Sequence, residues 1–435
     1  MIFKIMTIVI ITIIILIAFY VKYKSLTNRF WATQPCFHFF DIYYYFSNPA
    51  IIAKDLPQPN KYCDFVDVIT YSFQELTETQ QTEMVQFLQK NYDHLHVQSQ
   101  DQILPFFKGF LDKNNQPMIS FFYDTEHTQE NMIPSSDTEK IKKERIIKAT
   151  MTSRVMSFFA KGAYVGNVYY VDYLCVDKLN RKSGVAPKLI QTHEYNQRHR
   201  NKSIQISLFK REGELTFIVP LCAFKTHVYN ITSRQLPKWE NRKGNQKFVR
   251  VTSTNLHVWQ HCLQEKLLNE NSKFKVVMIN DIGNILELLN TENIWIFMVI
   301  TETPDNEDDV TAFYVFRLCG NHQSSSFSSS SSSSISSISC IGTVNFDDHD
   351  KDGFFWGFMN SLKWFQKETQ WMLLLEEVSD SNELIYMLNK YVVDNDDNDD
   401  DDLIFEYMQG QSCAYFFYNY AMTPILPTDA FLMVT

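Results

Sequence analysis

Residues 171–190, VDYLCVDKLNRKSGVAPKLI, constrain the fold more than any other stretch of this chain. The apolar, β-branched run that ends at Val176 is typical of a buried strand. A polar turn follows it, and Pro187 suits the first turn of a helix, where the missing N–H of proline costs little. The chain has only 12 Gly residues, which makes Gly184 in this turn informative. We therefore expect a strand–turn–helix unit with its helix over residues 184–200.

The turn has the composition of a phosphate-binding loop. A helix N-terminus presents free N–H groups and about half a positive charge, so that a pyrophosphate can bind there. Gly184 and Ala186 keep the backbone accessible, while Arg181, Lys182 and Lys188 add cationic side chains. The pattern Arg-x-x-Gly-x-Ala resembles the CoA-binding loop of the GNAT superfamily of acyltransferases. An ordinary strand–turn–helix unit with solvated basic side chains is the alternative.

The N-terminus is strongly apolar. Residues 5–21, IMTIVIITIIILIAFYV, contain no charge and are followed by Lys22 and Lys24. Seventeen helical residues reach roughly 25 Å, near the lower limit for crossing a bilayer. The small residues of a signal-peptide cleavage site do not follow. We predict a membrane-tethering helix at 5–21 and a short linker at 22–27. Lys22, Lys24 and Arg29 favour a cytosolic location for the rest of the chain.

The composition excludes several function classes. The chain has 435 residues, of which 45% are hydrophobic, and its net charge of −10 comes largely from one acidic run at 394–402. It has no basic stripe with interleaved aromatic residues, which argues against nucleic acid binding. The eight Cys form no CxxC pair, and the His residues have no second ligand pair at metal-binding spacing. We therefore expect reduced thiols and no metal.

Strands and helices are predicted to alternate along the chain, which indicates a mixed α/β fold. We expect loops at the Ser-rich tract 324–339 and at the acidic run 394–402. A helix should begin near Thr77, because Thr77 and Gln80 form a capping box. Strands are expected at 150–177, 204–209, 276–280, 294–301, 312–318, 372–375 and 414–420, and further helices at 184–200, 354–365 and 383–391.

Several separated segments together resemble the eukaryotic N-myristoyltransferases. Residues 28–35 (NRFWATQP) match that family's Phe-Trp-x-Thr-Gln-Pro, and 172–176 (DYLCV) are similar to its Asn-Phe-Leu-Cys-Val. The turn at 181–190 matches Arg-x-x-x-Leu-Ala-Pro-x-Leu-Ile, and 415–420 (YFFYNY) are similar to Tyr-Leu-Tyr-Asn-Trp. The segments keep the family's order, 56–58 (LPQ) fit between them, and the chain ends in an apolar tail as that family does.

The resemblance implies two GNAT-like halves related by a pseudo-twofold, here preceded by one N-terminal transmembrane helix. It assigns 1–27 to the membrane anchor and linker, 28–235 to a myristoyl-CoA-binding half, and 236–435 to a half that binds peptide and supplies the C-terminal carboxylate. The implied reaction transfers myristate from myristoyl-CoA to the N-terminal glycine of a protein. Myristoyl-CoA is then a co-substrate, with no permanent cofactor, and we expect a membrane-anchored monomer.

The resemblance also implies roles for residues. An amine that attacks a thioester forms an oxyanion, which needs two preorganised donors; these would be the backbone N–H groups of Tyr173 and Leu174. The base would be the C-terminal carboxylate of Thr435. The implied CoA-binding residues are Arg29, Phe30, Trp31, Leu174, Cys175, Val176, Arg181, Lys182, Ser183, Gly184, Val185, Ala186 and Pro187.

Two departures from the family keep alternatives open. Residues 205–213 read QISLFKREG, where the family has Tyr-Thr-Ala-Gly and a Pro-rich stretch. Asp172 stands where the family has Asn, and two roles are open for it: to neutralise the substrate ammonium, or to act only as a capping residue. The first alternative is a GNAT-type acyltransferase with a different acyl chain or acceptor. The second is a catalytically silent, membrane-anchored protein that binds acyl-CoA or peptide.

Overall fold

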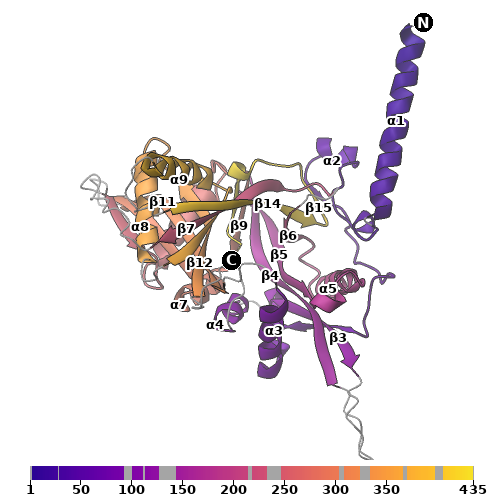
Figure 1. Cartoon of the computed structure of the whole chain (residues 1–435), viewed down its shortest axis with the longest axis horizontal. Coiled ribbons are helices and arrows are strands. Elements are labelled where there is room, and N and C mark those ends of the chain that lie inside the picture. The colour runs from indigo at the N-terminus through magenta and orange to yellow at the C-terminus, as the bar shows by residue number, and fades with distance from the viewer. Residues whose placement is uncertain are drawn as a thin grey trace, which may run out of the picture.

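The computed structural model contains a long N-terminal helix and a large mixed sheet covered by helices (Figure 1). It describes residues 2–27, 29–92, 100–110, 113–126, 144–213, 218–232, 246–302, 308–323, 334–365, 370–396 and 405–434. The strands are β1 (Ala50–Ile51), β2 (Val68–Ser72), β3 (Met118–Glu126), β4 (Glu144–Ala160), β5 (Ala163–Val176), β6 (Ser207–Glu212), β7 (Cys222–Thr232), β8 (Gln246–Arg250), β9 (Val276–Asn280), β10 (Ile294–Glu302), β11 (Asp308–Gln323), β12 (Ser334–Asn345), β13 (Gln370–Glu376), β14 (Phe405–Tyr418), β15 (Tyr420–Ala421) and β16 (Ala430–Leu432). The α-helices are α1 (Ile2–Thr27), α2 (Ile42–Phe46), α3 (Glu78–Asn91), α4 (Gln100–Ile103), α5 (Val185–Arg200), α6 (Leu256–Cys262), α7 (Ile282–Asn290), α8 (Lys351–Trp364) and α9 (Ser381–Asp396).

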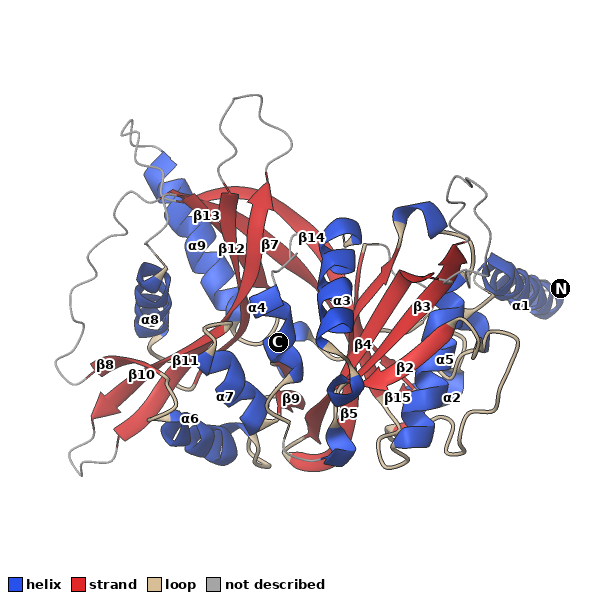
Figure 2. Ribbon diagram, turned by 90° about the horizontal axis from the view of Figure 1, so that it is seen from below, coloured by secondary structure: helices blue, strands red, loops and turns tan. Residues whose placement is uncertain are grey.

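The order of strands in the large sheet is symmetric, with equivalent strands of the two halves at equal distances from its centre. It runs β2-β3-β4-β5-β6-β14-β7-β13-β12-β11-β10-β8, with β9 and β16 attached beside β4. Strands β3, β4 and β5 are antiparallel neighbours, and so are β10, β11 and β12. In Figure 2, β2 and β3 lie toward one end of the molecule, β8 and β10 toward the other, and β7 and β14 between them.

Each half has one helical crossover. Helix α5 joins β5 to the parallel strand β6, and α8 lies between β12 and its parallel neighbour β13. The next strand of each half pairs with the opposite half, since β7 pairs with β13 and β14 with β6. The prediction of a mixed α/β fold with two halves related by a pseudo-twofold is confirmed. The proposed boundary between residues 235 and 236 lies outside the described residues.

The helices cover the sheet with apolar faces. Helix α5 packs Val185, Leu189 and Ile190 against a cluster that includes Met151 of β4. Helices α8 and α9 pack on the strands of the second half, where Trp371 and Phe358 are fully buried. The predicted capping box of α3 is present: the Gln80 N–H donates to Thr77 Oγ1 at 3.2 Å, and the Thr77 N–H donates to Gln80 Oε1 at 3.0 Å.

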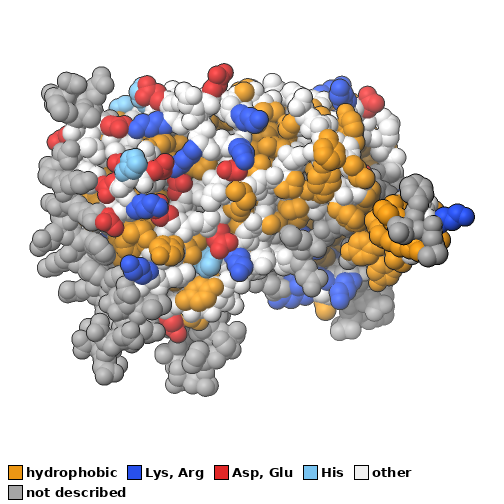
Figure 3. All heavy atoms as spheres, turned by 90° about the horizontal axis from the view of Figure 1, so that it is seen from above, with side chains coloured by type: hydrophobic (Ala, Val, Ile, Leu, Met, Phe, Trp, Pro, Cys, Tyr) orange, Lys and Arg blue, Asp and Glu red, His pale blue; other side chains and the backbone are white. Residues whose placement is uncertain are grey.

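Helix α1 stands away from the body of the molecule (Figure 1). Residues Lys4–Tyr23 form the one segment of the described chain that is long and apolar enough to cross a membrane, with a mean hydropathy of 2.7 and no burial. Its side chains form a hydrophobic patch at the edge of the molecule (Figure 3). A signal sequence would meet the same criterion. The helix continues through the predicted linker at 22–27 and ends at Thr27.

Two predicted loops are partly wrong. Strand β12 begins at Ser334, so the last part of the Ser-rich tract pairs with β11 and β13, while 324–333 lie outside the described residues. The backbone hydrogen bonds of a sheet do not depend on the side chain, so Ser is tolerated there. Helix α9 extends to Asp396 and takes in the first three residues of the acidic run, and 397–404 lie outside the described residues.

Candidate active site

The sheet opens between β5 and β6. Among the described residues these parallel strands pair only over Tyr169–Val171 and Ser207–Phe209. A cavity of about 370 Å³ lies at this opening and is lined by side chains from both faces of the sheet. Val171 and Met151 belong to the face that α5 covers, whereas Tyr170 and Tyr415 belong to the opposite face. The cavity therefore connects the two faces of the sheet.

Strand β5 bulges at the edge of this cavity. Thr150 pairs with Cys175 and Thr152 with Asp172, so that β5 holds one more residue than β4 between these pairs. Tyr173 lies in the bulge with a φ of +49°, a left-handed conformation that is uncommon for a bulky residue. The backbone of Tyr173 and Leu174 is thus turned out of the regular ladder, as the predicted oxyanion hole requires. Both residues line the cavity.

Asp172 occupies one of the two predicted donors. The Tyr173 N–H donates to Asp172 Oδ1 at 2.8 Å. The other carboxylate oxygen lies 3.4 Å from Nη2 of Arg154, a guanidinium that is almost fully buried. Arg317 approaches from the second half and donates to the Tyr173 hydroxyl at 3.2 Å. Asp172 therefore stabilises the bulge through the Tyr173 N–H and neutralises the buried guanidinium of Arg154. Sequence reasoning did not anticipate either arginine.

A second cavity, of about 660 Å³, lies over the turn between β5 and α5. It shares Tyr92 and Leu174 with the first cavity, so the two meet beside the bulge. Most of the predicted CoA-binding residues line it: Leu174, Cys175, Val176, Arg181, Lys182, Gly184, Val185, Ala186 and Pro187. The structure thus brings the predicted phosphate turn and the predicted oxyanion hole together.

The conformation of the turn explains its sequence. Gly184 is the N-cap of α5 with a φ of +88°, and it makes no side-chain cap hydrogen bond. This left-handed backbone favours glycine, and a Cβ at Gly184 would meet no atom within 4 Å. Arg181 is held by a hydrogen bond of 3.0 Å from its Nη2 to the carbonyl of Asn91. The start of α5 therefore keeps an uncapped N-terminus beside basic side chains.

The aromatic residues Phe30 and Trp31 pack against the same region. Phe30 packs in the cluster of Val185 and Leu189 at the start of α5. Trp31 lines the first cavity and stacks on Phe209 with ring centroids 5.5 Å apart. Arg29 is exposed, and neither Arg29 nor Ser183 is among the described residues that line the two cavities.

A partly buried ion pair lies on the face opposite α5. Nζ of Lys210 is 2.8 Å from Glu376 Oε1, and the Tyr415 hydroxyl donates to Glu376 Oε2 at 3.4 Å. Burial by itself lowers the pKa of Lys210, but Glu376 together with Cys413 and Glu212 outweighs this effect, and the pKa is raised. The unusual stretch at 205–213 thus lines the site with charge instead of lying on a solvated face. The partner is 166 residues away in sequence, so no local pattern could have indicated it.

The C-terminal tail reaches the same cavity. Strand β16 runs parallel to β9, and Val434 lines the first cavity. Residues Phe431 to Val434 are buried, as their apolar sequence predicts. Thr435, the predicted base, lies outside the described residues.

Three solved structures of Saccharomyces cerevisiae N-myristoyltransferase are similar to this chain. They hold bound myristoyl-CoA, in one case together with inhibitors, and match with TM-scores of 0.60, 0.62 and 0.61. Each is 14% identical and covers 92–93% of this chain and 94% of its own. No protein-family model matches the sequence, and no curated protein matches it. The chain therefore has the fold of N-myristoyltransferase over nearly its whole length, at a sequence identity that marks it as divergent.

Proposed function

We propose that this protein transfers an acyl chain, myristate as first candidate, from acyl-CoA to the N-terminal glycine amine of a protein. One observation carries the proposal: the cavity over the phosphate turn and the cavity through the sheet meet at Leu174, beside the left-handed Tyr173. A CoA held by its pyrophosphate at Gly184 would present its thioester at this junction. Myristoyl-CoA is a co-substrate in this proposal.

The chemistry follows from the junction. The acceptor amine attacks the thioester carbonyl carbon, the C–N bond forms, the C–S bond breaks, and CoA leaves as a thiolate. The backbone N–H groups of Tyr173 and Leu174 would stabilise the oxyanion that forms on the way. The ammonium proton must first pass to a base, for which we propose the carboxylate of Thr435, because its neighbour Val434 lines the cavity.

The two faces of the sheet divide the substrates between them. Walls from Trp31, Met151 and Val171 on the α5 side suit an acyl chain. The opposite side carries Asp172, Lys210 and Glu376, which suit an ammonium and a polar peptide. Both halves of the chain contribute to the peptide side, since Asp172 and Lys210 belong to the proposed myristoyl-CoA-binding half at 28–235 and Glu376 to the proposed peptide-binding half at 236–435.

Helix α1 would tether the enzyme. The exposed apolar segment at 5–21 supports an anchor that passes the bilayer once. We place the catalytic body in the cytosol, because Lys22, Lys24 and Arg29 follow the segment, and take it to be a monomer. Lipidated products would then be released beside a membrane.

The test uses the full chain in detergent with myristoyl-CoA and matched peptides that begin with Gly, Ala or Met. Mass spectrometry should detect a myristoyl increment on the Gly peptide alone. Transfer to the Ala and Met peptides as well would contradict glycine specificity, and the absence of any increment would contradict the reaction.

One observation favours a silent acyl-CoA binder as the second candidate. The Tyr173 N–H already donates to a carboxylate, and that negative charge would oppose an oxyanion at the same place. Asp172→Asn separates the two candidates. If the protein is an enzyme, Asn removes the charge and transfer becomes faster. If it is a silent binder, the variant binds myristoyl-CoA and still transfers nothing. A transferase with another acyl chain would differ from both in its response to a series of acyl-CoAs.

A further inference from the structure

We propose that Glu194 sets the upper limit of the acyl chain length that this protein accepts. The inference rests on the proposed function only in taking an acyl-CoA as the ligand. Glu194 is a carboxylate beyond the apolar walls that Met151, Val171 and Ile190 form, and neither the phosphate turn nor the oxyanion hole needs it.

The topology puts Glu194 deep in the acyl side of the cavity. Strand β5 runs toward the phosphate turn, and α5 returns from the turn along the same face of the sheet. Ile190 and Glu194 both line the cavity, and Glu194 is one helical turn farther from Gly184. A chain that starts at Leu174 and follows α5 inward therefore passes Ile190 before it meets Glu194.

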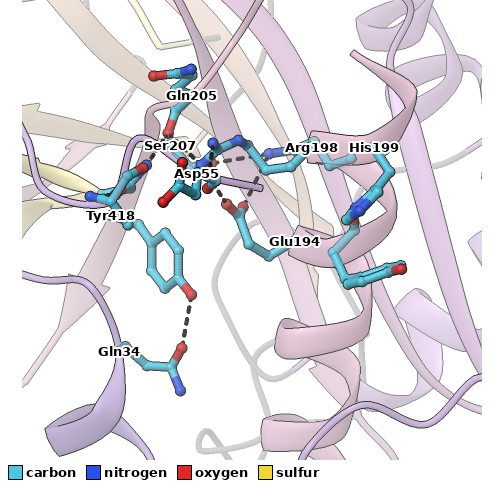
Figure 4. Close-up of polar contacts among 12 residues, drawn as sticks. Gln34, Asp55, Glu194, Arg198, His199, Gln205, Ser207 and Tyr418 are labelled. Atoms are coloured by element: carbon cyan, nitrogen blue, oxygen red, sulfur yellow. Dashed lines mark hydrogen bonds and ion pairs between the residues drawn. The ribbon is translucent and has the colours of Figure 1, made fainter. Parts of the chain in front are cut away.

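The deep end is polar. Glu194 is 6% exposed, and Ser207 and Tyr418, which also line the cavity, are equally well buried. Gln197 Nε2 donates to Glu194 Oε2 at 3.3 Å, and Arg198 Nη1 lies 3.9 Å from Oε1. Figure 4 shows the Glu194 carboxylate beside Arg198 and Ser207, with Tyr418 bonded to Gln34 nearby. The apolar walls thus end at a network of hydrogen-bonding groups.

This network penalises a long saturated chain. Methylene groups that reach Glu194 would displace water from a carboxyl and could offer it no hydrogen bond, and burying a polar group in that way is costly. Burial already raises the pKa of Glu194 to about 7, which indicates how little solvation the group has left. A chain that stops short of Glu194 avoids the cost. The affinity should therefore fall abruptly, by about tenfold or more, at one chain length.

The alternative is a purely structural role, in which Glu194 only pairs with Arg198. A structural role would change stability without changing the preference among acyl chains. The shape of the chain-length profile therefore separates the two roles better than any single affinity.

The experiment measures binding and transfer by the full-length protein for saturated acyl-CoAs from C10 to C18. Glu194→Leu should move the cut-off at least two carbons toward longer chains, and Glu194→Gln should move it less, because Gln keeps the size and the hydrogen bonds. Asn196→Leu is the matched control on the same helix, because Asn196 donates to Thr70 instead of lining the cavity. It should keep the wild-type profile.

A second measurement covers the case in which Glu194→Leu does not fold. The wild-type protein should bind the shortest rejected chain about tenfold more tightly when that chain carries a terminal hydroxyl, since Glu194 can form a hydrogen bond with the hydroxyl. Equal affinities for the hydroxylated and saturated chains, or one profile for all variants, would overturn the inference while leaving transfer intact. A shifted profile without transfer to any peptide would support the inference and overturn the proposed function.

Discussion

The two halves contain equivalent strand–turn–helix units whose turns differ in charge and in helix capping. In the first half the turn between β5 and α5 carries Arg181 and Lys182, and Gly184 caps the helix without a side chain. In the second half the turn between β12 and α8 carries acidic residues, and Asp350 Oδ1 accepts a hydrogen bond of 2.9 Å from the Gly353 N–H. One helix N-terminus is open to an external anion, and the other is already neutralised by its own chain.

The bulges differ in the same way. Val315 pairs with Gly342 and Phe316 with Cys340, so that β12 has an extra residue as β5 does. The bulge of β5 borders both cavities. The bulge of β12 contributes Ile341 to the first cavity, but the tail packs on it at Gly342, where a Cβ would lie 2.9 Å from the Phe431 ring. The pseudo-twofold thus supplies two bulges of similar pattern, and the tail covers part of the second.

The first prediction compares equivalent positions of helices α5 and α8. His193 of α5 is fully buried between Ser120 (2.8 Å) and Ser153 (2.9 Å), whereas α8 places Met359 at the same distance from its start. Burial is the largest cause that lowers the pKa of His193 from 6.5 to about 4. Below pH 6.5 the unfolded chain therefore binds a proton that the folded chain refuses, and stability falls. The loss should reach roughly 3 kcal/mol by pH 4.

The measurement is the free energy of unfolding of wild type and His193→Met at pH 7 and pH 4. The free energy of unfolding of the wild type should fall by roughly 3 kcal/mol relative to that of the variant between pH 7 and pH 4. Two parallel pH profiles would mean that His193 is protonated in the folded protein.

The second prediction breaks the open turn. Gly184→Glu places a carboxylate at the N-terminus of α5 and forces a side chain into a left-handed backbone. Acyl-CoA affinity should fall about 100-fold, or roughly 2.7 kcal/mol, because the carboxylate opposes the pyrophosphate. Calorimetric titration with myristoyl-CoA measures this change. Unchanged affinity would mean that the pyrophosphate does not bind at this turn.

The third prediction opens the covered part of the β12 bulge. Gly342→Val should displace Phe431 and cost about 2 kcal/mol of stability, since the tail packs tightly there. Transfer should drop about tenfold if the tail carries the base, while affinity for acyl-CoA stays unchanged. Parallel assays of binding and transfer separate these effects, and a loss of binding would place CoA nearer to the tail than proposed.

The smallest effect is expected at the capped turn. Asp350→Ala removes the N-cap of α8 and should cost about 1 kcal/mol of stability. It should leave acyl-CoA affinity unchanged, which makes it the control for Gly184→Glu at the equivalent turn. Chemical denaturation and titration of the same preparation measure both quantities. A weaker affinity would mean that the second half also takes part in CoA binding.

Local patterns allowed the fold class and several local elements to be predicted. The capping box at Thr77, the helix of the phosphate turn and the alternation of strands and helices depend on neighbours in sequence, and the structure confirms them. The ion pair Lys210–Glu376 and the contact of Arg317 with Tyr173 join residues that are 166 and 144 positions apart. No periodicity within one segment encodes such contacts.

The sequence by itself determined the apolar N-terminal helix, the turn at Gly184 and the burial of the C-terminal tail, because each follows from the residue types of one short segment. The tertiary structure alone decided which turn stays open, where the two cavities meet and which carboxylates line the first cavity. These depend on the exchange of β7 and β14 between the halves and on the opening of the sheet between β5 and β6. Both are long-range pairings, whose partners are selected by the packing of the whole sheet.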